Sequence, residues 1–368
     1  MLKNTDSPLS PIHRRLVEES IDWKLVERRR SEYPAIGRAY GLETLASGSA
    51  RPPYYCHYMA WRLGTWRSEA LFVRIAELLG VSESLPNWEH ERPLLSSCEF
   101  ADFWSLMWQM QVAEYLTTVG SDVRWAESGP DLSVLVDGQR WYVECYAPRK
   151  SFGLLEFVEE LLGHVEPDLR AHYDLCTPFQ LPRESERNGF IDSIFGSSLT
   201  AEKIAGAKDV GKAKSPVILY ADPSSSLKVY LEGDDGNAST PGVIPSTVGS
   251  AEGYLRVALK EVVSHKENSN ALEKHRPNVV AVNYLLSRDY QLATSFQRTA
   301  GTFFEGDLSP AIDALAISVV GIDQRLTKEQ FRIVRGSHRG LSRIGRMDGV
   351  PEPSVSSNIQ HAAQPARA

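Results

Sequence analysis

The sequence contains little cysteine, and its cysteines are widely spaced. Four occur among 368 residues, none of them in a Cys-x-x-Cys pair: Cys56, Cys98, Cys145 and Cys176. A zinc knuckle needs closely spaced thiolates, and a small secreted fold needs a dense set of disulfides. The cysteine pattern therefore argues against both, and we expect the protein to work in the reducing cytoplasm.

Long hydrophobic runs are also missing. The longest are VVAVNYLL at 279–286 and ALAISVVGI at 314–322. A membrane-spanning helix needs about 20 consecutive apolar residues, so these runs are typical of buried strands instead. The segment 1–15 has no apolar core, which a secretory signal peptide would require. We therefore expect neither a membrane partner nor secretion.

The chain as a whole has no excess of positive charge. Its formal net charge is −7, with 24% charged and 42% hydrophobic residues, as in ordinary globular proteins. These values exclude a protein that is basic over its entire surface, but a local basic patch for nucleic acid stays open. A chain of 368 residues is long enough for a sizeable core and about two domains.

Residues 1–95 form a predicted N-terminal helical region. Its best-marked segment is SEALFVRIAELLG at 68–80, in which Ser68 is a suitable N-cap and Gly80 a suitable stop. The apolar residues between them fall on one helical stripe: Leu71, Phe72, Ile75, Leu78 and Leu79. This pattern predicts an amphipathic helix.

A second helix is predicted at 96–120. It opens with the capping-box residues Ser96 and Glu99, and Gly120 is a suitable end. Three short segments rich in β-branched and aromatic residues follow, and we expect each to form a strand: 122–127, 131–136 and 139–146.

The rest of the chain alternates predicted helices and strands. Helices are expected at 152–164 and 251–266, and further strands at 215–222, 227–232, 279–286 and 314–322. This alternation predicts an α/β (mixed α+β) core over 96–325, with a polar, loop-rich insertion at about 182–250. We see no internal repeat.

A basic, disordered tail is expected at 326–368, because Phe331 is the only aromatic residue from 327 onward. Residues 325–346 contain seven arginines and lysines against one acid. Clustered guanidinium groups are suited to phosphate contacts with a nucleic acid. A solvated basic segment with no partner explains the same composition.

A β-hairpin is predicted between the second and third of the three short strands. Asp137-Gly138 is a strong signal for a two-residue turn, and this register places Asp131 directly opposite Glu144. Alternation then divides the side chains between two faces. The core face receives Leu132, Val134, Val136, Trp141, Val143 and Cys145, and the second face receives Asp131, Ser133, Tyr142, Glu144 and Tyr146.

The opposed acids need an explanation. Directly opposed residues have Cβ atoms roughly 5 Å apart, where like charges are destabilising. Such a pair persists if both acids are solvated, if they share a proton, or if they bind a cation. Mg²⁺ takes oxygen ligands from one or two carboxylates and completes its shell with water and phosphate.

This arrangement resembles the PD-(D/E)XK nuclease superfamily, the restriction-endonuclease-like fold. The matching residues are Pro130-Asp131 and the motif Glu144-Cys145-Tyr146, within a resemblance that covers about 97–165. The resemblance implies a mixed central sheet flanked by helices. It also implies a protein that cuts or processes DNA or RNA with Mg²⁺ or Mn²⁺, one or two ions.

Two positions depart from the family pattern. Tyr146 stands where the family has a lysine, and Lys150 is the residue that we expect to supply the missing charge. The family's acid on the preceding helix would fall on Gln109, whose carbonyl oxygen suits a metal or its water. Glu114 is the nearest acid, five residues on and about 140° round the helix.

The resemblance implies roles for the remaining residues. Asp131 and Glu144 would hold the metal ion, with the carbonyl of Cys145 as a further ligand. Lys150 would orient the attacking water or stabilise charge on the phosphate. A rival hypothesis is a pseudonuclease, in which the chemistry is weakened or lost and the fold serves as a nucleic-acid-binding or protein-interaction module.

Other motifs give no support to other chemistries. GAKDVGKA at 206–213 has the glycine spacing of a phosphate-binding loop, but Ala213 stands where that loop needs Ser or Thr. The nine histidines show no metal-ligand spacing. Oligomeric state is not indicated by the sequence.

Overall fold

The computed structural model describes eleven segments of the chain: 21–47, 57–65, 69–98, 100–147, 169–175, 217–221, 227–233, 270–283, 312–318, 320–336 and 340–347. Lys150 and the helices predicted at 152–164 and 251–266 lie outside the described residues.

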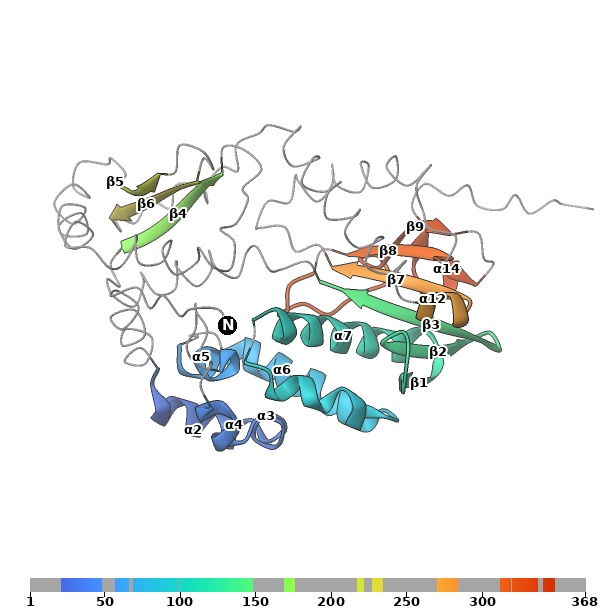
Figure 1. Cartoon of the computed structure of the whole chain (residues 1–368), viewed down its shortest axis with the longest axis horizontal. Coiled ribbons are helices and arrows are strands. Elements are labelled where there is room, and N and C mark those ends of the chain that lie inside the picture. The colour runs from blue at the N-terminus through green and yellow to red at the C-terminus, as the bar shows by residue number, and fades with distance from the viewer. Residues whose placement is uncertain are drawn as a thin grey trace, which may run out of the picture.

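Short helices make up the described N-terminal part of the chain (Figure 1). The predicted helix at 68–80 is confirmed, but it continues through Gly80 to Ser84. A glycine inside a helix costs only about 1 kcal/mol relative to alanine, and the buried face of this helix continues beyond Gly80 to Ser82. The elements are α2 (Trp23–Glu32), α3 (Pro34–Ala39), α4 (Leu42–Ala46), α5 (Tyr58–Thr65), α6 (Glu69–Ser84), η1 (Trp88–His90) and η2 (Arg92–Ser96).

The long helix α7 (Phe100–Val119) leads into the sheet and ends at Gly120, as predicted. A Cβ atom at Gly120 would lie 2.5 Å from Val134 Cγ2 and 2.8 Å from the carbonyl oxygen of Leu135, so the chain can turn this close to the sheet only with glycine. The predicted cap is different: Ser96 ends η2, and its hydroxyl donates to the carbonyl of Pro93 at 2.7 Å.

A mixed seven-stranded sheet follows, in the order β1-β2-β3-β7-β8-β9-β10. Strands β1, β2 and β3 form an antiparallel meander, β3, β7 and β8 run parallel, β9 is antiparallel to β8, and β10 is parallel to β9. The α/β class is therefore confirmed. The strands are β1 (Ser121–Trp125), β2 (Leu132–Val136), β3 (Gln139–Tyr146), β7 (Asn278–Asn283), β8 (Ala314–Ser318), β9 (Arg332–Gly336) and β10 (Arg346–Met347).

The expectation of a disordered tail from residue 326 is wrong for the described residues up to 347. They contain β9, the short helix α14 (Leu341–Ile344) and β10, which complete the sheet. The basic composition concealed an apolar set that packs in the core, namely Phe331, Ile333, Leu341 and Ile344.

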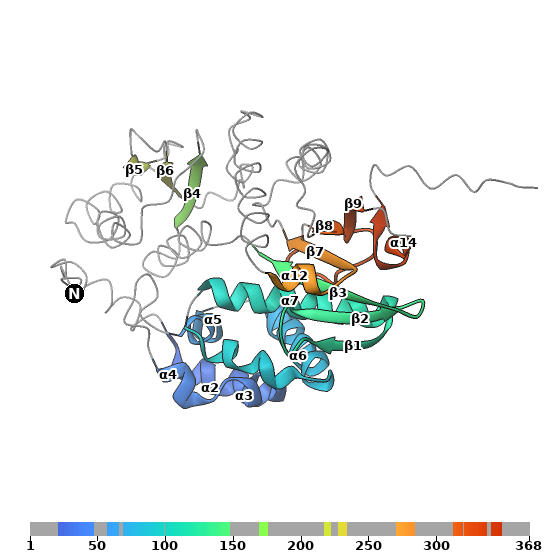
Figure 2. The same ribbon diagram turned by 45° about the vertical axis from the view of Figure 1, so that its right-hand side comes forward.

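Helix α7 packs on one face of the sheet, and α5 and α6 lie on the far side of α7 (Figures 1 and 2). Buried residues of the helices and of the α7-facing side of the sheet form one continuous core. The indole of Trp108 on α7 donates to the carbonyl of Ala281 on β7 at 3.0 Å, which ties the helix to the middle of the sheet. The core is thus continuous across the boundary predicted at residue 95, with buried residues on both sides of it packed together.

A second, three-stranded antiparallel sheet has the order β4-β6-β5. Strands were expected for two of its members, β5 (Val217–Ala221) and β6 (Leu227–Gly233), but not for β4 (Leu169–Leu175). The helix α12 (Asn270–Lys274) immediately precedes β7. Within the described segments, no helix combines the length and the apolar character needed to cross a membrane.

Candidate functional site

The hairpin register predicted from Asp137-Gly138 is confirmed. Both turn residues have positive φ, 48° and 81°, and the ladder pairs Val134 with Trp141 and Leu132 with Val143. The division of β3 into two faces is also confirmed, because Trp141, Val143 and Cys145 are buried and Tyr142, Glu144 and Tyr146 are partly exposed. The same register places Asp131, one residue before β2, abreast of Glu144.

The Asp131 side chain is directed differently from the expectation that it projects from the second face. Its Oδ2 accepts a hydrogen bond from the backbone N–H of Cys145 at 2.6 Å. In this ladder, the hydrogen-bonded pair after Leu132 and Val143 would be Pro130 and Cys145. The Asp131 carboxylate therefore closes the ladder in place of a peptide carbonyl, and it lies along the end of the two strands.

Gln109 on α7 contacts the same carboxylate. Its Nε2 donates to Asp131 Oδ1 at 3.1 Å, and the residue is 6% exposed. An ionised carboxylate only accepts hydrogen bonds, so the amide nitrogen must face it and the carbonyl oxygen must be turned away. That oxygen, Oε1, is buried and has no hydrogen-bond partner among the described residues. A buried oxygen without a donor is costly, and a cation or an ordered water would satisfy it.

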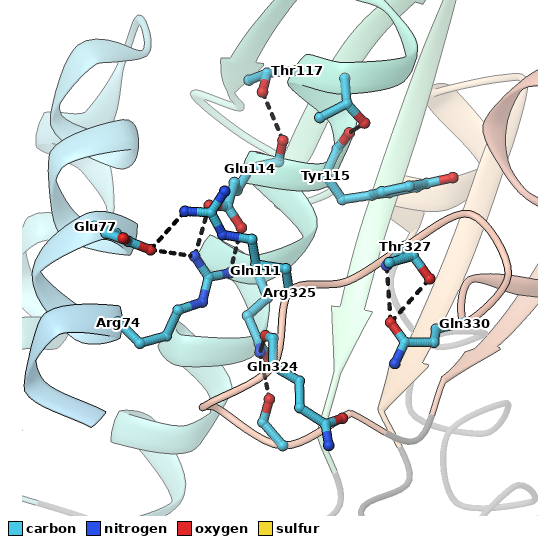
Figure 3. Close-up of polar contacts among 12 residues, drawn as sticks. Arg74, Glu77, Gln111, Glu114, Tyr115, Thr117, Gln324, Arg325, Thr327 and Gln330 are labelled. Atoms are coloured by element: carbon cyan, nitrogen blue, oxygen red, sulfur yellow. Dashed lines mark hydrogen bonds and ion pairs between the residues drawn. The ribbon is translucent and has the colours of Figure 1, made fainter. Parts of the chain in front are cut away.

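Glu114 does not join this group as expected. It lies on the α6 side of α7, where its two carboxylate oxygens accept hydrogen bonds from both terminal nitrogens of Arg74 (Figure 3). Arg74 also contacts Glu77, which in turn contacts Arg325. The displacement of five residues along α7 directs Glu114 and Gln109 to different neighbours. Glu114 is therefore better explained as a structural residue of the α6–α7 interface.

A third acid that the sequence analysis missed is Glu91, between η1 and η2. Burial raises the pKa of this carboxyl, against the lowering effect of His90, and the negative charge of Glu144 raises it further. The position follows from the packing of η1 on β1, where Trp88 contacts Trp125 with ring centroids 5.2 Å apart. No local motif marks Glu91, so only the folded chain identifies it.

His275 was also missed. Its imidazole lies against Gly129, whose φ is 96°. A Cβ atom at position 129 would lie 2.8 Å from Cε1 and 2.9 Å from Nδ1 of His275. The same ring contacts Tyr142 edge to face, with centroids 4.9 Å apart. Tyr142 shares a strand face with Glu144, and Gly129 lies two residues before Asp131. A residue far along the chain therefore reaches both acid-bearing segments.

The basic segment at 325–346 contributes surface ion pairs. Arg325 pairs with Glu77 at 2.9 Å and Arg346 with Glu329 at 3.0 Å. Arg343 lies 3.6 Å from Asp137 at the hairpin turn, which is about 20 Å of strand away from Asp131. Arg343 is therefore too far from Asp131 to contact a phosphate bound there.

The donor atoms at this end of the hairpin suit a hard cation. Among the residues that the structure describes, no three His, Cys, Asp or Glu side chains are grouped to hold a metal ion. Mg²⁺ needs only one or two carboxylates and accepts amide oxygens and water for the rest of its shell. The carboxylates of Asp131 and Glu144 and the unpartnered carbonyl of Gln109 are oxygen donors of this class.

Comparison with known proteins supplies no relative: no protein-family model, curated protein or solved structure matches this chain. The chemistry of the site has to be inferred from its own residues.

Proposed function

We propose that the protein is a divalent-metal-dependent phosphodiesterase of the restriction-endonuclease-like class that acts on DNA or RNA through Asp131 and Glu144. The observation that carries this proposal is the register of the β2–β3 hairpin, which sets the two acids abreast where the ladder ends. The mixed sheet flanked by helices agrees with what the resemblance implies.

The contacts of Asp131 suit a metal-binding carboxylate. Two neutral N–H donors, from Cys145 and Gln109, fix its position and stabilise its negative charge. Each carboxylate oxygen has two lone pairs, so accepting one hydrogen bond leaves a further pair for a cation. Glu144, opposite in the register, is the second carboxylate, and a cation bound between the two would be held by both negative charges.

A bound Mg²⁺ or Mn²⁺ would acidify a water molecule and neutralise charge on the phosphate. The protein residues position the reactants. The Gln109 carbonyl is available to orient water, and Tyr142 and Tyr146 on the partly exposed strand face are available to stack on a base. Lys150 stays our proposal for the positive charge.

The alternative is a pseudonuclease that binds nucleic acid or protein without cleavage. Two observations favour it: Tyr146 is neutral where the family has a lysine, and both oxygens of Asp131 already accept hydrogen bonds from the protein. A carboxylate satisfied in this way can stabilise the hairpin end with no metal.

Thermal unfolding with and without Mg²⁺ or Mn²⁺ tests the site in wild type and Asp131→Asn. Metal at 100 times its Kd should stabilise the wild type by about 2.7 kcal/mol, because it binds the native state alone. In the variant, Asn Oδ1 can accept from Cys145 and its NH₂ can donate to Gln109 Oε1 once that amide turns over. The variant should fold, and its shift should be lost.

Asp137→Asn is the matched control, since it removes one acid from the same hairpin at a position where φ is 48° and asparagine is tolerated. Its metal shift should equal that of the wild type. Nicking of plasmid, single-stranded DNA and RNA, compared with Glu144→Gln, then separates an enzyme from a binder. Equal metal shifts in wild type and Asp131→Asn, or no shift in either, would contradict the proposed site.

A further inference from the structure

The loop before β7 places His275 against Gly129 and Tyr142, in the two segments that carry the acids. The side-chain amide of Asn278, which is fully buried, donates to the carbonyls of Leu272 at 2.8 Å and of His275 at 3.2 Å. The backbone N–H of Tyr142 donates to the carbonyl of Pro277 at 3.0 Å. The loop is thus fastened both to itself and to the strand that carries Glu144.

Gly129 shows that the imidazole and the Pro130-Asp131 segment are fitted to each other. Any side chain at 129 would overlap the ring, and φ 96° is a conformation that other residues rarely adopt. Tyr142 limits the ring on another side. His275 nevertheless stays partly exposed, as do Asp131 and Glu144, so all three belong to a region that solvent reaches.

The chemistry of the ring fits a phosphate. Imidazole carries an N–H donor in both its neutral and its charged form, whereas Tyr142 offers one hydroxyl and the two acids only accept. The neighbouring Arg276 is directed elsewhere, since its guanidinium pairs with Asp313 at 3.3 Å. A phosphodiester that approaches Asp131 and Glu144 brings anionic oxygens, which need a donor on the protein.

We propose that His275 is a substrate-binding residue of the Asp131–Glu144 site, which donates an N–H to a phosphate oxygen of the nucleic acid. This inference rests on the proposed function. It assigns to the loop before β7 a task that the resemblance gives to a lysine at the position of Tyr146.

Two substitutions separate this task from simple packing. His275→Phe keeps a ring against Gly129 and Tyr142 but removes the donor, whereas His275→Gln keeps an N–H donor but loses the ring. We expect His275→Phe to weaken binding of a labelled single-stranded oligonucleotide in metal-free buffer by about 10- to 100-fold, as for a lost hydrogen bond to a charged group. His275→Gln should bind within about tenfold of the wild type. Cleavage with Mg²⁺ should follow the same order.

Each outcome has a definite meaning. Full binding and cleavage by His275→Phe, or an equal loss in both variants, overturns the role of His275 while the metal site stands. Loss of the metal-dependent thermal shift in both variants also overturns it, because His275 would then maintain the site instead of contacting the substrate. A wild type with neither metal shift nor cleavage overturns the proposed function, and this inference with it.

Discussion

Two groups of partly or fully buried charged residues lie near α7, and burial affects their charge in opposite ways. At the α6–α7 interface, the 5% exposed Arg74 meets Glu114 and Glu77 (Figure 3). Burial lowers the pKa of Arg74, but Glu114 and Glu77 outweigh it and raise the pKa above its usual value, so the charge is kept. At the hairpin end, the raised pKa of Glu91 means the reverse, that the negative charge is disfavoured.

The difference distinguishes a structural cluster from the site for which we propose a function. Arg74 and Glu114 compensate each other's charge through two hydrogen bonds, although Arg74 Nε has no hydrogen-bond partner among the described residues. Near Asp131 the carboxylate accepts hydrogen bonds from two neutral N–H donors, and the carbonyl oxygen of Gln109 is left unpartnered in the described part of the chain. The raised pKa of Glu91 near the strand end is a more useful guide to a site than the larger ion-pair cluster.

The largest effect is expected where the structural cluster is broken. Glu114→Ala removes the partner that engages both terminal nitrogens of Arg74 and should cost about 3 kcal/mol, measured by urea unfolding. The double variant Arg74→Met/Glu114→Leu replaces the pair with apolar volume and should cost less than the single change. A double variant less stable than Glu114→Ala would show that the pair contributes more than it costs to bury.

A smaller effect is expected at His57, which is 1% exposed and lies in the helical layer. Its Nδ1 accepts from the N–H of Met59 and its Nε2 lies 3.1 Å from the carbonyl of Leu95, so the neutral form with hydrogen on Nε2 fits both. Burial lowers its pKa, against the opposing bond to Leu95. The unfolded chain therefore binds this proton more readily than the native state.

Stability should consequently fall as the pH is lowered below 6.5, the ordinary histidine value, and the fall should stop below the native pKa. We expect His57→Gln to reduce this pH dependence, measured as the difference in free energy of unfolding between about pH 7 and pH 5. An unchanged slope in the variant would assign the dependence to other histidines.

The smallest effect is expected at Glu91, in the group of acids at the hairpin end. A raised native pKa means that the native state loses stability as the pH rises above 4.5, the ordinary value. Glu91→Gln should therefore raise the thermal midpoint at pH 7 and leave it unchanged well below pH 4.5. Glu89→Gln, an exposed acid on the same turn, is the control and should have little effect. A neutral or destabilising Glu91→Gln would contradict the raised pKa of Glu91, which burial and, to a lesser extent, Glu144 produce.

What the sequence could predict was local. The register of the hairpin follows from Asp137-Gly138 and from alternation over a few residues. The two apolar runs are sufficient to predict the buried strands β7 and β8. Glu91 and His275 reach the site only through contacts between distant segments, which no spacing rule encodes. The basic stretch hid β9, because its composition outweighed the buried strand residues Ile333 and Val334 and the buried Phe331 just before them.

The closure of the ladder at Cys145 by the Asp131 carboxylate has a mechanical consequence. Elsewhere in the sheet, parting two strands means breaking bonds between rigid peptide groups. At this end the strands are joined through the side chain of Asp131. Rotation about its single bonds can change the distance between the ends of β2 and β3 without breaking a bond between two peptide groups. The hairpin is thus more easily deformed at its Asp131–Cys145 end than along the rest of its ladder.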